Sequence, residues 1–454
     1  MSVIDPERVA PGNPVSAGRL LQLVRRGIAT TRRDLIRVTG LSRSTVTQRV
    51  DALLGAGLLR ESAGEAEGRG RPAGSLAFDE GFGHVLVAGV YRDRVELTAV
   101  DLGGRELRRR VFDMAVAAGP EPVLGAIESE LDRLVAESGI DPARTVAIGV
   151  GVPGPVDVAV GRVMQPPVMP GWHDYPVRDR LAARLGVPVL VENDANLMAL
   201  GEQRATWASV PSLLLVTVGS GIGAGIVING RLYRGIDGGA GDIGHIRMYG
   251  HDERCACGAV GCLAAVASGD ALARRLAVMG KDVSQVDDVR RLVHEGDPDA
   301  IAAVRTAGQL TGEVMTTVVS VLNPEILVLA GEMAYTNEYF VTGMRELIYQ
   351  RSLPRATRRL RVVSTTLGDR ASVIGMTELA VDEVFAPRPS TLALEPPAET
   401  PTRVHPDRDS RNVGFALPRV ALSVYASRGL SAAELGCASL YCGVAQAGTT
   451  PASR

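Results

Sequence analysis

One histidine and three cysteines in the middle of the chain form a set of metal-binding residues. They are His245, Cys255, Cys257 and Cys262, within the run GHIRMYGHDERCACGAVGC. One imidazole and three thiolates complete a tetrahedral set for zinc and leave no position for a reactive water, so the spacing predicts a structural zinc site. Gly258 and Gly261 lie where a short chain must turn around the metal. Three buried cysteines beside a core histidine, or a disulfide, are the alternatives. We call residues 245–262 the zinc loop.

The composition is that of a globular protein with two or three domains. The chain has 454 residues, of which 46% are hydrophobic and 22% charged. The net charge of -2 identifies no partner, but its distribution is uneven. Residues 14–78 contain eleven arginines and five acidic residues, a net charge of +6, so the remainder carries -8. A basic segment attached to an acidic body predicts that the first segment contacts a polyanion.

The cellular compartment follows from three features. The chain begins without the basic and then apolar pattern of a signal peptide. No apolar run approaches the roughly 20 residues that span a bilayer, so we expect no membrane partner. Clustered thiols that act as metal ligands fit a reducing compartment. We therefore expect a cytoplasmic protein.

The segment before residue 60 shows apolar residues at helical spacing in three successive stretches. Thr31 and Ser42 are suited to cap the second and third helices, and Gly40 and Gly57 to end them. The residues expected to face inward are Leu20, Leu21, Val24, Leu35, Ile36, Val38, Val46, Val50, Leu53 and Leu54. A helix, a short glycine-containing turn and a second helix predict a helix-turn-helix motif. A plain helical bundle is the alternative.

The third helix and the loop after it carry the residues that we expect to contact double-stranded DNA. The outward residues of this helix are Ser42, Arg43, Ser44, Thr45, Thr47, Gln48 and Arg49. Hydroxyl, amide and guanidinium groups reach base edges and phosphates. The run LLRESAGEAEGRGRPAGSLAF then predicts a β-wing whose tip, with Arg69 and Arg71, enters a minor groove; a solvated loop is the alternative. Residues 14–78 are thus predicted to form a winged helix-turn-helix domain.

The remainder of the chain alternates between strands and helices. GHVLVAGVY, RVELTAVDLGG and RRRVFDMAV predict three strands, and a helix is expected over residues 122–138. TVAIGVGVPGPVD, PVLVENDANLMALGE, LLLVTVGSGIGAGIVING and NPEILVLAGEM continue the pattern. Two such halves predict an α/β protein of the actin-like, ribonuclease-H-like architecture over residues 83–387, with a ligand cleft at the strand ends. Residues 388–454 are rich in proline and charge, which predicts a disordered tail.

Five motifs in order give the chain a family resemblance. GVPGPVD, VENDAN, GSGIGAGIVINGRLYRG, AGDIGHI and CACGAVGCL resemble the ROK family (repressor, open reading frame, kinase), in particular its transcriptional regulators, over about residues 15–387. The resemblance implies a two-lobed sugar-kinase fold, zinc on the four residues of the zinc loop, and a homodimer or homotetramer. It also implies that Asn193 and Asp194 hold sugar hydroxyls and that His245 contacts both sugar and zinc. Gly154 and Asp242 complete the expected effector site.

The chain departs from the family pattern at four positions. Gly89 and Tyr91 stand where the kinases have the aspartate and glycine of the first phosphate loop, so we expect neither ATP nor magnesium to bind. Asp242 and Ala264 replace two glutamates, which weakens or alters sugar binding. These features predict a sugar-responsive transcriptional repressor and not an enzyme. The alternatives are a sugar kinase that uses Asp194 as its base, and a regulator that has lost its sugar effector.

Overall fold

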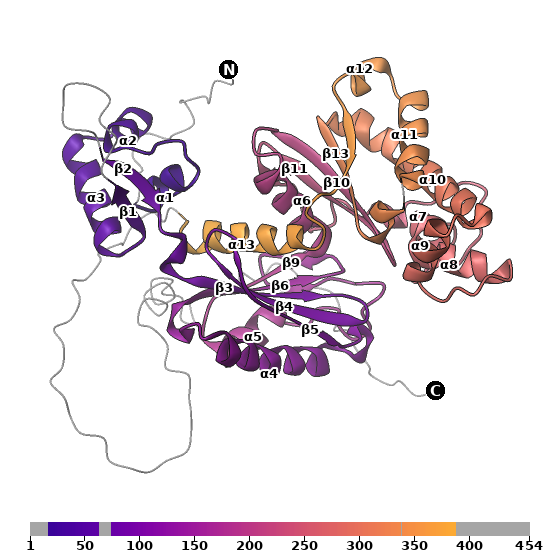
Figure 1. Ribbon diagram of the computed structural model, residues 1–454, viewed down its shortest axis with the longest axis horizontal. Helices are drawn as coiled ribbons and strands as arrows, with labels where there is room; N and C mark the ends of the chain where they lie inside the picture. The colour runs from indigo at the N-terminus through magenta and orange to yellow at the C-terminus, as the bar shows by residue number, and fades with distance from the viewer. Residues whose placement is uncertain (1–16, 63–73, 337, 387–454) are drawn as a thin grey trace, which may run out of the picture.

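The computed structural model of the protein describes residues 17–62, 74–336 and 338–386. Three bodies are visible in Figure 1: a small N-terminal module, formed by residues 17–62 and 74–78, and two larger lobes. The expected wing-tip residues Arg69 and Arg71 lie outside the described residues, as do the tail at 388–454 and residues 14–16. No helix in the described ranges is long and apolar enough to cross a membrane.

The N-terminal module has the predicted order of three helices followed by a β-hairpin. Its elements are α1 (Ala17–Arg25), α2 (Arg32–Thr39), α3 (Arg43–Gly55), β1 (Leu59–Ser62) and β2 (Ser75–Phe78). The Thr31 side chain accepts a hydrogen bond from the Asp34 backbone N–H at the start of α2, and Ser42 accepts one from Thr45 at the start of α3. Gly40, with φ of 68°, ends α2. The two strands pair antiparallel.

The predicted inward face of the module is correct except at one residue of α2. Leu20, Leu21, Leu35 and most of the other expected residues are buried, and Ile36 and Leu54 are half-buried. Val38 is 42% exposed, so its inward assignment was wrong. The inward face of α2 is centred between Leu35, Ile36 and Thr39, and at 3.6 residues per turn Val38 lies about 110° around the helix from that centre.

Lobe 1 is a five-stranded sheet covered by helices on both faces. Its strand order is β5-β4-β3-β6-β9, and the strands are β3 (His84–Val90), β4 (Arg94–Asp101), β5 (Glu106–Asp113), β6 (Thr145–Val152) and β9 (Val189–Asn193). Helices α4 (Pro120–Ser138) and α5 (Val177–Leu185) pack on one face through a single core. Helix α13 (Arg370–Val384) lies across the other face (Figure 1). The small hairpin of β7 (Val156–Asp157) and β8 (Arg162–Val163) precedes α5.

Lobe 2 repeats the same plan. Its strand order is β12-β11-β10-β13-β14, and the strands are β10 (Ser212–Val218), β11 (Ile222–Ile228), β12 (Arg231–Leu232), β13 (Ile326–Ala330) and β14 (Arg361–Ser364). In each sheet three antiparallel strands are followed by two parallel ones. Helix α6 (Asp194–Ala205) contacts one face. The other helices are α7 (Leu263–Ala267), α8 (Gly269–Val278), α9 (Val286–His294), α10 (Pro298–Leu322), α11 (Tyr339–Arg351) and α12 (Pro354–Thr357). This repeat confirms the predicted two-lobed α/β architecture.

Helices α6 and α13 each leave one lobe and pack against the other. Helix α6 follows β9 of lobe 1 directly but packs on β10 and β11 of lobe 2. Helix α13 follows β14 of lobe 2 but packs on β3 and β6 of lobe 1. The two helices also pack against each other, so they form a contact between the lobes.

Candidate metal centre, interlobe cleft and DNA-binding surface

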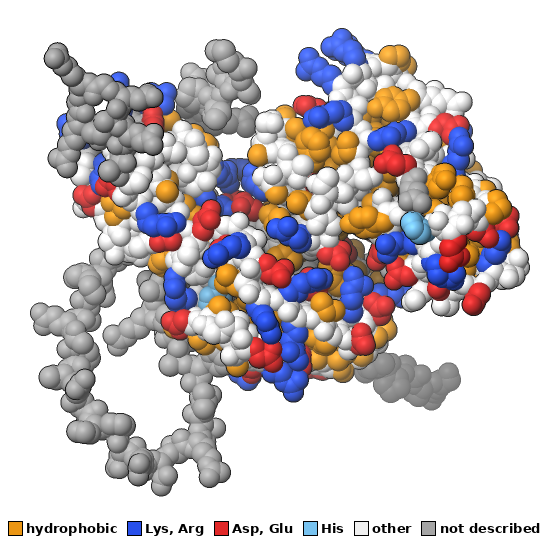
Figure 2. Space-filling model, viewed as in Figure 1, with side chains coloured by type: hydrophobic (Ala, Val, Ile, Leu, Met, Phe, Trp, Pro, Cys, Tyr) orange, Lys and Arg blue, Asp and Glu red, His pale blue; other side chains and the backbone are white. Residues whose placement is uncertain are grey.

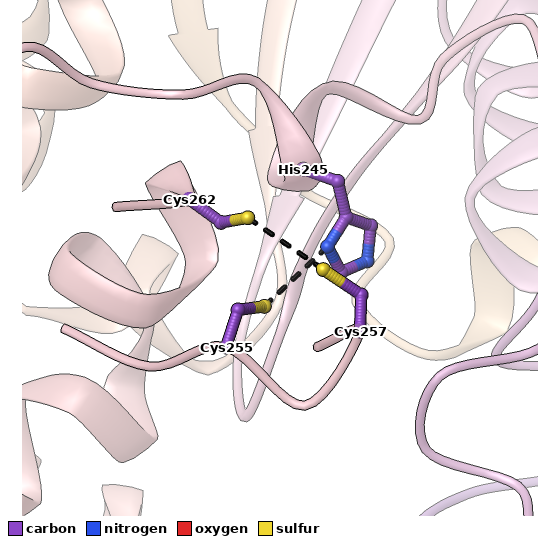
Figure 3. Close-up of side chains that lie close together, drawn as sticks. All are labelled: His245, Cys255, Cys257 and Cys262. Carbon is purple, nitrogen blue, oxygen red and sulfur yellow. Dashed lines mark hydrogen bonds between the residues drawn. The ribbon is translucent and has the colours of Figure 1, made fainter. Parts of the chain in front are cut away.

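The four predicted metal ligands lie together (Figure 3). The ligand atoms of His245, Cys255, Cys257 and Cys262 are all within 4.8 Å of one another. Cys255 Sγ lies 3.5 Å from His245 Nδ1, and Cys257 Sγ lies 3.6 Å from Cys262 Sγ. An ion about 2.3 Å from sulfur and about 2.0 Å from nitrogen separates tetrahedral ligand atoms by roughly 3.5–3.8 Å. The arrangement therefore fits one tetrahedral metal ion, whereas 3.6 Å is too long for a disulfide bond.

The backbone around the cluster is folded tightly enough to present all four side chains. Isolated antiparallel bridges join Arg247 to Cys262 and Arg254 to Val260. Gly261 has φ of 73°, and a side chain there would meet the His251 carbonyl oxygen at 2.5 Å. Only glycine fits this turn without strain.

The charges of the thiols also favour a bound cation. Burial, together with the adjacent thiols, raises the pKa of Cys262 to about 12. Three thiolates at this spacing repel one another, so their joint ionisation requires a positive ion among them. The donor set matches zinc or another thiophilic divalent metal.

One ring nitrogen of His245 faces the metal cluster, and the other ring nitrogen faces Asp242. It is the last residue of a 3-10 turn, Ile243–His245, that follows Asp242 directly. Nδ1 points toward Cys255, and Nε2 lies 3.9 Å from Asp242 Oδ1. Two of the expected effector residues thus meet at the edge of the zinc loop.

Asn193 and Asp194 lie where β9 ends and α6 begins. The Asn193 side chain caps α6 by accepting a hydrogen bond from the Asn196 N–H at 3.1 Å, and its Nδ2 donates to the Gly154 carbonyl oxygen at 3.1 Å. The structure therefore brings Gly154 and Asn193 together. Asp194 Oδ1 accepts a hydrogen bond from the Ala195 N–H at 2.8 Å.

Two residues that sequence reasoning did not identify hold this turn in place. Buried Glu192 accepts hydrogen bonds from the Asn193 N–H at 3.0 Å and from Asn196 Nδ2 at 2.9 Å. Arg234 Nε donates to its other carboxylate oxygen at 2.7 Å. Glu192 belongs to the VENDAN motif and Arg234 to the GRLYRG motif. The two motifs are visible in the sequence, but the sequence does not show that these two residues pair with each other.

Strand β11 lies beside the turn that carries Asn193 and Asp194 and also beside the turn that carries Asp242 and His245. A side chain built on Gly225 would meet the Ala195 carbonyl oxygen, next to Asp194, at 2.3 Å. One built on Gly244, between Asp242 and His245, would meet the Ile222 carbonyl oxygen at 2.2 Å. Contacts among the described residues join Gly154 to Asn193 and Asp242 to His245, but they do not join one pair to the other.

Two carboxyl groups, those of Asp194 and Glu332, have pKa values above their ordinary range. Burial raises the pKa of Asp194 to about 6, and the charge of Glu332 adds to this rise. Burial also raises the pKa of Glu332. A side chain built on Gly219 of the GSGIG loop would lie 1.9 Å from Glu332 Oε2, so the glutamate covers the first glycine of that loop. Sequence reasoning missed Glu332, because it stands over a hundred residues away from the loop.

Tyr91 covers the first loop in a similar way. A side chain built on Gly89 would lie 3.1 Å from the Tyr91 ring, so the ring occupies space that a larger residue at 89 would need. The Arg94 guanidinium stacks 4.5 Å from the ring centroid. Beside this loop, Arg92 of lobe 1 pairs with Asp270 at the start of α8 in lobe 2.

The expected DNA-contacting residues lie along α3, with differing exposure. The exposed side chains are Ser42, Arg43, Ser44, Thr47 and Gln48. The Ser42 hydroxyl is 2.9 Å from that of Ser44 and 2.8 Å from that of Thr45, which is half-buried. Arg49 is half-buried, and its Nη1 is enclosed without a hydrogen-bond partner among the described residues. Arg49 is therefore less free to reach a phosphate than Arg43.

The sequence matches the ROK family over residues 92–383. It is 28% identical over 374 residues to the xylose repressor of Caldicellulosiruptor bescii, which covers 78% of this chain and 92% of that protein. The structure is similar to a ROK family transcriptional regulator described as a homologue of the Escherichia coli MLC protein, with a TM-score of 0.70, 25% identity and coverage of 81% of this chain and 96% of that chain. It is also similar to a ROK family glucokinase from Streptomyces griseus solved with glucose and AMPPNP. The TM-score is 0.58 and the identity 27%, with coverage of 65% of this chain and 99% of that chain. The chain belongs to the ROK family.

Proposed function

We propose that this protein is a sugar-responsive transcriptional repressor. The N-terminal module binds operator DNA through α3 and its wing, and the cleft between the lobes binds a sugar or sugar derivative. Binding of the sugar lowers the affinity of the protein for its operator, and the coupling is reciprocal. As a homodimer or homotetramer, the protein would present two α3 helices to a palindromic site.

One observation carries the proposal: the N-terminal module and lobe 1 share a hydrophobic core. Leu20, Leu21 and Val24 of α1 pack in the same cluster as Met376 and Val381 of α13. A module that is packed against the body, and not joined by a free linker, responds to movements of that body. The similarity to a xylose repressor and to a ROK transcriptional regulator, both over more than three quarters of this chain, supports the same function.

We propose zinc as the metal of the zinc loop. The three thiolates and His245 Nδ1 would hold it, and a set of four protein ligands leaves it a structural role. The ion would fix the loop that ends at Cys262 and so hold His245 beside Asp242. Removal of the metal is expected to affect sugar binding through that histidine.

The cleft geometry favours a repressor over a sugar kinase. The Tyr91 ring lies against Gly89 of the first phosphate loop, and Glu332 places a carboxylate on the glycine-rich GSGIG loop, where it would repel a nucleotide phosphate. Asp194 is the one feature that favours the kinase, because a carboxylate with a pKa of about 6 is suited to accept a proton near neutral pH. A coupled assay for sugar-dependent ADP production tests the kinase, and we expect no activity with D-glucose or D-xylose.

The test of the regulator is recovery of genomic DNA by the purified protein, followed by sequencing, at near-physiological salt. Enrichment of a few palindromic sites is expected. Salt-sensitive background binding alone would contradict the proposal, because phosphate contacts give affinity without sequence preference. A thermal shift with D-xylose and D-glucose then distinguishes a sugar-responsive regulator from one that has lost its effector, an alternative that Asp242 and Ala264 favour.

A further inference from the structure

Helix α6 packs mainly against lobe 2, and helix α13 packs mainly against lobe 1. A side chain on Gly225 of β11 would meet the Ala195 carbonyl oxygen of α6 at 2.3 Å, so α6 is tightly seated on the lobe 2 sheet. A side chain on Gly149 of β6 would meet Met376 Cγ of α13 at 2.1 Å, so α13 is tightly seated on the lobe 1 sheet. Any opening or closing of the lobes is therefore a movement of α6 against α13.

The two helices cross at a pair of glycines. A side chain on Gly201 of α6 would lie 1.8 Å from the Ala371 carbonyl oxygen, and one on Gly375 of α13 would lie 2.0 Å from the Leu197 carbonyl oxygen. The backbones are in direct contact, which makes this crossing the natural pivot for the lobes. At 1.5 Å per residue, Asp194 lies about 10 Å from Gly201 along α6, and Arg204 lies about 5 Å beyond it.

Arg204 connects lobe 2 to α13 on the short side of this pivot. Its Nη2 donates to the carbonyl oxygen of Gly230, in the turn between β11 and β12, at 2.9 Å. Its Nε lies 3.5 Å from Glu378 Oε2, and its Nη2 lies 3.9 Å from Asp382 Oδ2, both on α13. Burial lowers the pKa of Arg204, and the charge of Arg26 lowers it further.

The same two carboxylates hold the N-terminal module. Arg25 Nη2 lies 2.5 Å from Glu378 Oε1, Arg25 Nη1 lies 3.0 Å from Asp382 Oδ1, and Arg26 Nη2 lies 3.0 Å from Asp382 Oδ2. The Arg25 side chain is only 8% exposed, so these pairs are weakly screened. Figure 2 shows positive and negative side chains together in the recess between the module and the lobes. Three guanidinium groups thus share two carboxylates where the module and both lobes meet.

We propose that Arg204 competes with Arg25 and Arg26 for Glu378 and Asp382, and that this junction passes movement of the lobes to the N-terminal module. The inference rests on the proposed function, because an effector at the start of α6 is what would move the lobes. A tilt of α6 about the glycine crossing displaces Arg204 relative to the carboxylates. The ion pairs between α13 and the arginine at the end of α1 then become stronger or weaker, and the orientation of α3 changes with them.

The substitution Arg204→Gln in the full-length chain tests the junction. It removes the competing cation while it keeps a long polar side chain, so α1 should be held more firmly. Without sugar, hydrogen exchange of the amides of residues 20–25 should slow about fivefold. Arg180→Gln is the matched control, because Arg180 is a partly buried arginine that pairs with Glu128 inside lobe 1, away from the junction. Unchanged exchange in Arg204→Gln, or an equal change in the control, would overturn the proposal.

A second measurement tests the transmission. The affinity for the recovered operator is measured with and without saturating D-xylose, and again with D-glucose, while calorimetry gives the sugar affinity. Arg204→Gln should bind the sugar within about twofold of the wild type but lose at least fivefold of the sugar-induced change in operator affinity. A full sugar response in this variant would refute transmission through Arg204. If neither sugar changes operator binding by the wild type, the sugar response of the proposed function fails, and the exchange result alone decides the junction.

Discussion

The carboxyl group of Asp194 should make the stability of this protein depend on pH in a way that one substitution removes. Burial raises the pKa of Asp194 in the folded chain to about 6, against an ordinary value of 3.8. Between about pH 4 and pH 6, the folded chain therefore retains a proton that the unfolded chain releases. Stability falls as the pH rises through this window, and above it the loss is constant.

The size of the effect follows from the shift. A rise of about two pKa units corresponds to about 3 kcal/mol at pH above 6. The side chain retains some solvent exposure, so we expect the smaller value of about 1–2 kcal/mol. Asp194→Asn keeps the oxygen that accepts from the Ala195 N–H but removes the charge. The variant should match the wild type near pH 4 and exceed it in stability by this amount near pH 7.5.

Urea unfolding of both proteins from pH 4 to pH 8 measures the difference. Asp252→Asn, which removes an exposed carboxylate in the zinc loop, is the control for the change in net charge. Glu332→Gln is a second probe, since its charge raises the pKa of Asp194, and this variant should shrink the pH-dependent difference. A stability difference between Asp194→Asn and wild type that is the same at pH 4 and pH 7.5 would refute the reasoning.

Three further predictions follow from the site and the fold. Cys257→Ser should abolish stoichiometric zinc binding and lower the melting temperature. A chelator should lower the melting temperature of the wild type by the same amount but should not lower that of the variant further. Full metal content of the variant by elemental analysis would contradict the assignment of Cys257 as a ligand. Arg43→Ala should weaken operator binding and reduce the magnitude of the salt slope by about one, whereas Gln48→Ala should leave the slope unchanged; equal slopes in all three proteins would argue against a phosphate contact. Gly375→Ala should lower the free energy of unfolding by about 1–3 kcal/mol or more, because its Cβ would lie 2.0 Å from the Leu197 carbonyl oxygen, and an unchanged urea midpoint would show that the helix crossing is loose.

The parts of this structure that the sequence predicted well depend on residues near one another in the chain. Thr31 and Ser42 cap helices whose first turns they adjoin, and each hydrogen bond reaches only three residues ahead. The four metal ligands fall within eighteen residues, so their spacing alone defined the cluster. The repeated order of strands was likewise visible as two runs of alternating pattern. Local chemistry sufficed for these features because the contacts that matter are local.

The parts that the sequence did not reveal depend on distant pairs. Glu332 lies against Gly219 of the GSGIG loop because β13 pairs in parallel with β10 and ends beside that loop. Nothing in the chain near Arg204 indicates that Glu378 and Asp382 are its partners. Val38 was misassigned because helical spacing gives the width of an apolar face but not its orientation toward a neighbour that the sequence does not place.

The topology explains how the N-terminal module, which precedes the first strand of lobe 1, comes to lie beside α13. Helix α13 is the last helix among the described residues, and it lies against lobe 1, in which the two-lobed fold begins. The N-terminal module therefore meets α13 with only a short connection, and Phe385, just after α13, packs edge-to-face with Phe78 and Phe82 at centroid distances of 6.4 and 6.3 Å. Since α13 also crosses α6, the carboxylates of α13 that hold the module, Glu378 and Asp382, also lie beside Arg204 of α6. The charge at the end of α6 therefore shares two carboxylate partners on α13 with the arginine at the end of α1.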